Sequence, residues 1–130
     1  MRFINEDTGE VVANEVELAE GLWRRLRGLM FRRKFLLGNA LLFKFKKPGR
    51  HRVHTFFVRF PIDLVYMDSD LKVVEVRPCL EPWRIYRPKA AAEYLIELPA
   101  GAAARANIEV GHKILLEGKV FNKQKCKLNC

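Results

Sequence analysis

Asp63 is the residue of this sequence whose surroundings most favour a chemical role. It lies in "HTFFVRFPIDLVYMD" (54–68), an apolar stretch that opens with His54 and contains one arginine, Arg59. Side chains alternate between the two faces of a strand, and both faces of this stretch are apolar, so the carboxylate should be at least partly buried. A buried carboxylate must find partners or bind a proton. We favour an architectural carboxylate held by loop amides or by Arg59, and the alternative is a general base in a pocket.

The other residue types that could do chemistry lack a suitable spacing. His51 and His54 would lie on opposite faces of one strand and His112 is far along the chain, so we predict no metal site and no cofactor. Ser69 is the sole serine and lies in a turn, with no histidine-carboxylate relay evident from the sequence. The single glycine of "ELPAGAAARA" (97–106) does not make a phosphate-binding loop. No catalytic residue is therefore assigned.

The segment "PWRIYRPK" (82–89) alternates aromatic and cationic residues between prolines. Such alternation suits either base stacking in a basic groove or an edge strand that buries Trp83 and leaves its arginines in water. A candidate pocket or groove is thus assigned to His54, Arg59, Asp63, Trp83, Arg84 and Tyr86.

The chain is strongly basic, with 24 Lys and Arg against 15 Asp and Glu and a net charge of +9. The excess is carried by residues 23–34, 44–52 and 119–127. This charge attracts polyanions without specifying one. Because the basic segments are separated in the sequence, we expect a diffuse field and weak, non-specific binding of nucleic acid.

Length and composition indicate one domain, with a β-rich body over residues 1–118 and a basic tail over 119–130. No apolar run is long enough to cross a bilayer and no leader is evident, so we expect a cytoplasmic protein with no membrane contact. Cys79, Cys126 and Cys130 match neither a redox pair nor zinc-ligand spacing. They predict no disulfide framework, and the roles of the last two stay open.

The pattern of apolar residues predicts a mainly β fold. Residues 2–13 indicate a hairpin, and residues 15–27 indicate one main helix capped by Asn14. Short strands are predicted at 40–46, 53–60, 62–68, 71–76, 83–86, 92–98 and 113–118, with a short helical segment near Gly101. We expect a small antiparallel β-barrel or jelly-roll-like sandwich with the helix packed against it. The expected core contains Phe56, Val58, Ile62, Leu64, Tyr66, Val74, Leu95 and Ile114.

Several blocks together resemble a known family. They are "RRLRGLM" (24–30), "FPIDLVYMDSDLKVVEV" (60–76), "YLIELPAG" (94–101) and "IEVGHKI" (108–114). From about Leu18 to Leu115 the chain resembles the uncharacterised family called domain of unknown function 192. The resemblance implies a barrel or sandwich of jelly-roll type, with no established activity and no catalytic residues.

The chain departs from the family pattern at four places. His54 stands where many members have tryptophan, Phe57 where they have asparagine, and His112 where an aspartate follows glycine. Cys79 lacks the second cysteine of the pair that other members carry. These departures resemble an archaeal branch of the family.

Three functional hypotheses follow. The leading one is a non-enzymatic binding module with a pocket or groove near Asp63, for an unknown small ligand or protein. The alternatives are an enzyme that uses Asp63 as general base and a weak nucleic-acid binder that acts through its basic surface. The oligomeric state stays open.

Overall fold

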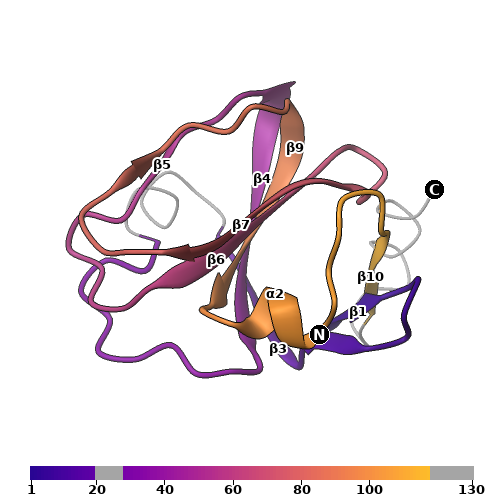
Figure 1. Ribbon diagram of the computed structural model, residues 1–130, viewed down its shortest axis with the longest axis horizontal. Helices are drawn as coiled ribbons and strands as arrows, with labels where there is room; N and C mark the ends of the chain where they lie inside the picture. The colour runs from indigo at the N-terminus through magenta and orange to yellow at the C-terminus, as the bar shows by residue number, and fades with distance from the viewer. Residues whose placement is uncertain (20–27, 118–130) are drawn as a thin grey trace.

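The computed structural model describes residues 1–19 and 28–117, which form a mainly β fold (Figure 1). The elements are β1 (Arg2–Asn5), β2 (Val11–Ala13), β3 (Glu15–Leu18), β4 (Asn39–Gly49), β5 (Val53–His54), β6 (Ile62–Met67), β7 (Val73–Leu80), β8 (Ile85–Tyr86), β9 (Ala92–Pro99), α2 (Ala102–Arg105) and β10 (Ile114–Glu117). No helix within these residues is long and apolar enough to cross a membrane. The predicted tail, 119–130, lies outside the described residues.

A five-stranded sheet of order β3-β4-β9-β6-β7 forms the centre. The pair β3–β4 is parallel and the other pairs are antiparallel. All six residues of β6 are buried, which requires that both faces of the sheet be covered.

The two faces of this sheet carry two separate apolar clusters, because alternate residues of each strand point to opposite sides. On the helix side, Val65 and Ile96 pack with α2 and with the small sheet β10-β1-β2. On the loop side, Leu64 and Leu95 pack with Val53, from the two-stranded sheet β5-β8. Figure 1 shows β5 and the β1–β10 pair on opposite sides of the central sheet.

The predicted core is confirmed. Six of its eight members are buried: Val58, Ile62, Leu64, Tyr66, Leu95 and Ile114. Phe56 and Val74 are partly buried. The predicted N-terminal hairpin is present as β1 and β2.

The helix predicted over 15–27 is wrong at its start. Residues Glu15–Leu18 form β3, which pairs with β4 in parallel. Along this strand Glu15 and Glu17 are exposed while Val16 and Leu18 are partly buried. This polar-apolar alternation has the period of a strand. The hydrogen bonds to β4 stabilise the strand more than a local helical preference would stabilise a helix. Residues 20–27 lie outside the described part of the chain.

The expected barrel is not formed by the described strands, whose three sheets stay separate and open. The predicted strand 53–60 is also shorter than expected. Only Val53 and His54 pair, with β8, and the chain then turns at Phe56 and Phe57. The turn leaves a loop above the loop side of the sheet.

Asp63 connects β6 to two neighbouring elements. Its pairing neighbours Ile62 and Leu64 face Leu80 and Arg77, so the single residue Asp63 lies opposite two residues of β7 and the pair is bulged. The side-chain Oδ1 of Asp63 accepts the backbone N–H of Cys79 within this bulge at 2.9 Å. The carboxylate thereby replaces a ladder bond that the bulge removes.

The second oxygen of Asp63 caps α2. It accepts the N–H groups of Gly101 at 3.1 Å and Ala103 at 2.9 Å. Gly101 has φ 93°, a left-handed conformation that glycine adopts without strain. Since the first amides of a helix have no intrahelical acceptor, the wholly buried carboxylate satisfies donors that would otherwise be unpaired. Backbone amides, not Arg59, are its partners.

We expect Asp63→Ala to lower the free energy of unfolding by about 2–4 kcal/mol, because one buried and two partly buried amides lose their acceptor. Urea denaturation measures the change. Asp70→Ala removes an exposed carboxylate from the β6–β7 turn and is the matched control, with an expected change within about 0.5 kcal/mol. Equal changes for the two variants would contradict this structural role.

Candidate functional site

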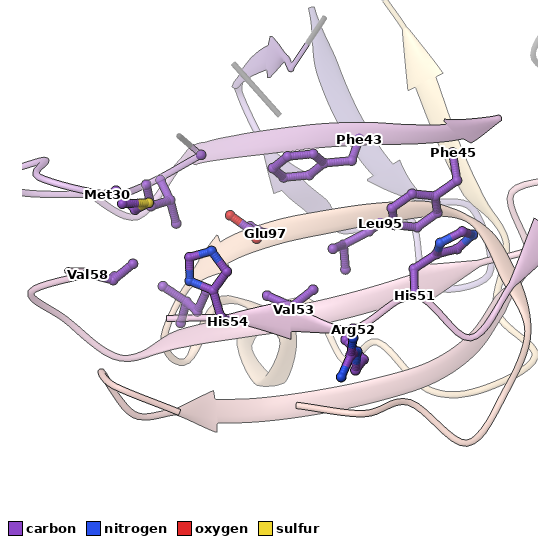
Figure 2. A pocket seen from close by; sticks show the side chains of 13 residues that line it. Met30, Phe43, Phe45, His51, Arg52, Val53, His54, Val58, Leu95 and Glu97 are labelled. Atoms are coloured by element: carbon purple, nitrogen blue, oxygen red, sulfur yellow. The ribbon is translucent and has the colours of Figure 1, made fainter. Parts of the chain in front are cut away.

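A pocket of about 440 Å³ lies on the loop side of the central sheet (Figure 2). Its floor comes from β4, β6 and β9 and its wall from the segment 51–58. The lining residues are Gly28, Leu29, Met30, Phe43, Phe45, His51, Arg52, Val53, His54, Val58, Ile62, Leu95 and Glu97. The volume falls in the range of ordinary small-molecule sites.

Glu97 is the acidic residue among them, in the middle of β9. Its pairing partners are Leu41 of β4 and Leu64 of β6, so it lies in the centre of the sheet. Only 6% of the residue is exposed. Figure 2 shows its carboxyl group in the middle of the pocket, between Phe43 and Val53.

Burial raises the pKa of Glu97 to about 8, and Arg32 opposes this only in part. The cause is the loss of hydration, which penalises the charged form. No residue within 1–19 or 28–117 donates a hydrogen bond to this carboxyl group. At neutral pH Glu97 is therefore mostly a neutral acid, able to donate one hydrogen bond into the pocket.

Gly28 lies beside this carboxyl group. A Cβ atom at Gly28 would lie 3.7 Å from Cζ of Phe43 and 3.9 Å from Oε1 of Glu97. The residue has φ 49°, which a side chain would strain. Both distances are ordinary van der Waals contacts, so the left-handed φ, and not a lack of space, favours glycine here.

Two histidines lie at the rim. His51 stacks on Phe45 with ring centroids 3.9 Å apart, and its Nε2 donates to the carbonyl of Lys47 at 2.8 Å. The exposed His54 stacks on Phe56, and its Nδ1 accepts the N–H of Phe56 at 3.2 Å. The Nε2 atom of a neutral His54 therefore carries the proton. Arg52 is exposed at the same rim.

Of the six residues assigned from sequence, His54 alone lines this pocket. Asp63 lies one residue beyond Ile62 and points to the helix side of the sheet. Arg59 and Trp83 line a neighbouring hollow, which shares Val58 with the pocket. Arg84 is exposed and bridges Glu81 at 3.4 Å.

Tyr86 fixes a loop beside the pocket. Its hydroxyl donates to Oε2 of Glu75, whose Oε1 accepts the N–H groups of Lys89 and Ala90 at 2.8 and 2.9 Å. Burial, followed by the hydrogen bond to Glu75, raises the pKa of Tyr86 to about 12, so the phenol remains a donor. The arrangement anchors the 86–90 segment through one carboxylate.

Glu97 is the residue that the sequence analysis missed. The signal was present, because "YLIEL" (94–98) sets one carboxylate in an apolar run, the same pattern that drew attention to Asp63. No group of three His, Cys, Asp or Glu within the described ranges could hold a metal ion.

Comparison with known proteins identifies the family. The model of domain of unknown function 192, described as uncharacterized ACR, matches residues 3–116. A UPF0127 protein of Pyrococcus abyssi is 39% identical over 113 residues, which cover 85% of this chain and 93% of the relative. A UPF0127 protein of Pyrococcus horikoshii is 38% identical, over 85% of this chain and 95% of its own. The chain belongs to the domain of unknown function 192 family.

A solved structure shares the fold of this family member. It is a protein from Sinorhizobium meliloti, provisionally described as a transcription regulator, with a TM-score of 0.77 and 25% identity over 87% of this chain and 88% of that one. The archaeal relatives from Pyrococcus confirm the archaeal character that the sequence indicated.

The blocks that carry the resemblance to the domain of unknown function 192 family meet at the central sheet. Gly28, from the first block, lies against Glu97 of the "YLIELPAG" block. Ile62 lines the pocket, and the adjacent Asp63 binds the amide of Gly101 on the other face. The blocks of the resemblance therefore lie around one sheet, with the buried Asp63 on its helix side and the pocket on its loop side.

The raised pKa of Glu97 predicts a pH-dependent stability. Between the ordinary pKa of 4.5 and the folded value of about 8, the folded chain holds a proton that the unfolded chain has lost. Stability therefore falls as the pH rises through this window, by at most about 1.4 kcal/mol per pH unit. Relative to Glu97→Gln, the wild type should lose stability between pH 5 and 8 in urea denaturation. If stability changed with pH in the same way for both proteins, Glu97 would have the same pKa in the folded and the unfolded chain.

Proposed function

We propose that this protein is a binding module for a small, mainly apolar molecule with one uncharged hydrogen-bond acceptor. The observation that carries the proposal is the Glu97 carboxyl group, buried in an apolar pocket with its pKa raised to about 8. Within residues 1–19 and 28–117 this buried group has no hydrogen-bond partner, which is costly, and a ligand acceptor would offset that cost.

The walls suit the apolar part of such a ligand. Phe43 and Phe45 lie along one side, with Leu95 and Val53 near them (Figure 2). The polar rim, with Arg52 and His54, is the solvent end of the pocket. A few convergent polar groups in an apolar cavity are the usual composition of a ligand site.

Proton transfer by an enzyme is the second candidate, and Glu97 favours it in place of Asp63. An acid whose pKa lies near the working pH can both donate and accept a proton. Asp63 is less suited, because its two oxygens already accept three amides. The candidates differ in outcome, since an enzyme converts a bound compound and a binding module returns it unchanged.

Binding of prodan, a fluorescent naphthyl ketone with a neutral carbonyl, tests the proposal. We expect the wild type to bind the dye at pH 6 and to lose roughly three- to tenfold in affinity at pH 9, where the Glu97 carboxylate cannot donate. Glu97→Gln should bind at both pH values, because its amide still donates. Glu97→Leu should bind weakly at both.

The control variant is Val110→Ala, which alters an exposed apolar residue away from the pocket and should bind as the wild type does. An affinity for the dye that changes neither with Glu97→Leu nor with pH would contradict the proposed role of this carboxyl group. Recovery of altered dye would support an enzyme instead.

A further inference from the structure

Basic residues are concentrated in three segments, 29–37, 50–60 and 81–89. Together these contain nine Lys and Arg and one acid, Glu81, a net charge of +8. The other described residues contain eight Lys and Arg and thirteen Asp and Glu, a net charge of −5. The three segments therefore carry the positive excess of the described part of the chain.

Hydrogen bonds hold the three segments together. The buried Thr55 donates from its Oγ1 to the carbonyl of Glu81 at 2.6 Å and accepts the N–H of Arg84 at 2.8 Å. The N–H of Phe31 donates to the carbonyl of Phe57 at 2.9 Å. Segments that are separated in the sequence thus form one surface.

Three aromatic side chains project from this surface. Phe31, Phe57 and Trp83 are 53%, 46% and 57% exposed. The ring centroids of Phe31 and Phe57 are 5.2 Å apart, and those of Phe57 and Trp83 are 4.7 Å apart. Together with Arg59 and Pro82 they border the shallow hollow that shares Val58 with the pocket. A contiguous exposed aromatic cluster of this kind marks an interaction site more often than isolated apolar residues do.

The backbone at all three rings is strained. Phe31, Phe57 and Trp83 have φ of 64°, 61° and 62°, in the left-handed region that bulky residues avoid. Strained conformations of this kind persist where the surroundings enforce them and are concentrated at binding sites. Glycine would fit these positions without strain, so the bulky rings are retained at a cost in folding stability.

We propose that Phe31, Phe57 and Trp83, with Arg59 and Arg84, form an aromatic-basic surface that binds single-stranded nucleic acid. Exposed bases stack on the rings and the phosphates pair with the guanidinium groups. Arg84 is available for this pairing, because its bridge to Glu81 is long and both side chains are largely exposed. This site is separate from the Glu97 pocket and does not depend on the function proposed for it.

The alternation of rings and guanidinium groups favours a nucleic acid over an anionic membrane. Arg59 lies two residues from Phe57, and Arg84 follows Trp83 directly. Interfacial membrane binding segregates inserted rings from cations that stay at the headgroups, whereas here the rings and guanidinium groups are interleaved. A single strand presents bases and phosphates in the same alternation.

Fluorescence anisotropy with a labelled thymidine oligomer tests the proposal at low and at high salt. We expect the single strand to bind more tightly than a duplex of the same length, with part of the affinity persisting at high salt. Trp83→Gly, which also relieves the strained φ and so preserves the fold, should lower single-strand affinity roughly tenfold at high salt. The control Val110→Ala, at an exposed aliphatic residue outside this surface, should leave the affinity unchanged.

Arg59→Ala and Lys72→Ala remove the same charge, inside and outside the aromatic-basic surface. Only Arg59→Ala should lower the salt dependence of binding, by reducing the slope of log affinity against log salt concentration by about one. Equal binding of single and double strands that vanishes at high salt, with no effect of Trp83→Gly, would overturn the proposal in favour of a diffuse field. Trp83-dependent binding to phosphatidylserine vesicles without oligomer binding would overturn it in favour of a membrane.

Discussion

Burial of the central sheet on both faces is the constraint on which the rest of this structure depends. Every side chain of β6 is out of contact with water, and so is most of β9. Any carboxylate on these strands must therefore be satisfied by the protein or bind a proton. Asp63 and Glu97 show the two outcomes. Asp63 accepts three amides, whereas Glu97 meets an apolar pocket and has its pKa raised to about 8.

The contrast between these two acids explains where function is expected. A carboxylate whose lone pairs are all directed at the main chain stabilises the fold and is closed to ligands. Retaining an acid without such partners in a core costs stability, and that cost is understandable where the group serves a ligand. The two faces of one sheet thus separate the architectural carboxylate from the proposed binding site, and Asp63 and Glu97 lie on adjacent paired strands.

The alternation of side chains along the strands made the buried residues on the helix side of the sheet predictable from sequence. It placed Asp63 in the core and identified amides as possible partners, and it located most of the buried residues. The same reasoning applied to "YLIEL" would have found Glu97. Alternation in "NEVEL" (14–18) would likewise have replaced the start of the predicted helix by a strand, since Glu15 and Glu17 share one face.

Other features depend on contacts between distant segments and could not be predicted. The described strands form three separate sheets, and β5 pairs with β8 over only two residues. The left-handed conformations of Phe31 and Trp83 have no local glycine or asparagine signal. The concentration of charge is also a product of folding, since bonds from Thr55 join 50–60 to 81–89. The sequence shows the basic segments as separate stretches and does not show these bonds.

The segment from Val53 to Arg59 contributes to both proposed sites. Val58 is a wall of the Glu97 pocket on one side and of the hollow beneath Trp83 on the other. Thr55 holds this segment through its side chain and through main-chain bonds to Trp83 and Arg84, at 2.9 and 2.8 Å. A ligand that moved Val58 in the pocket would therefore also move a wall of the aromatic-basic surface. The segment 28–31 offers a second connection, because Leu29 and Met30 line the pocket and Phe31 lines the hollow. Linkage requires any coupling between the two sites to be equal in both directions.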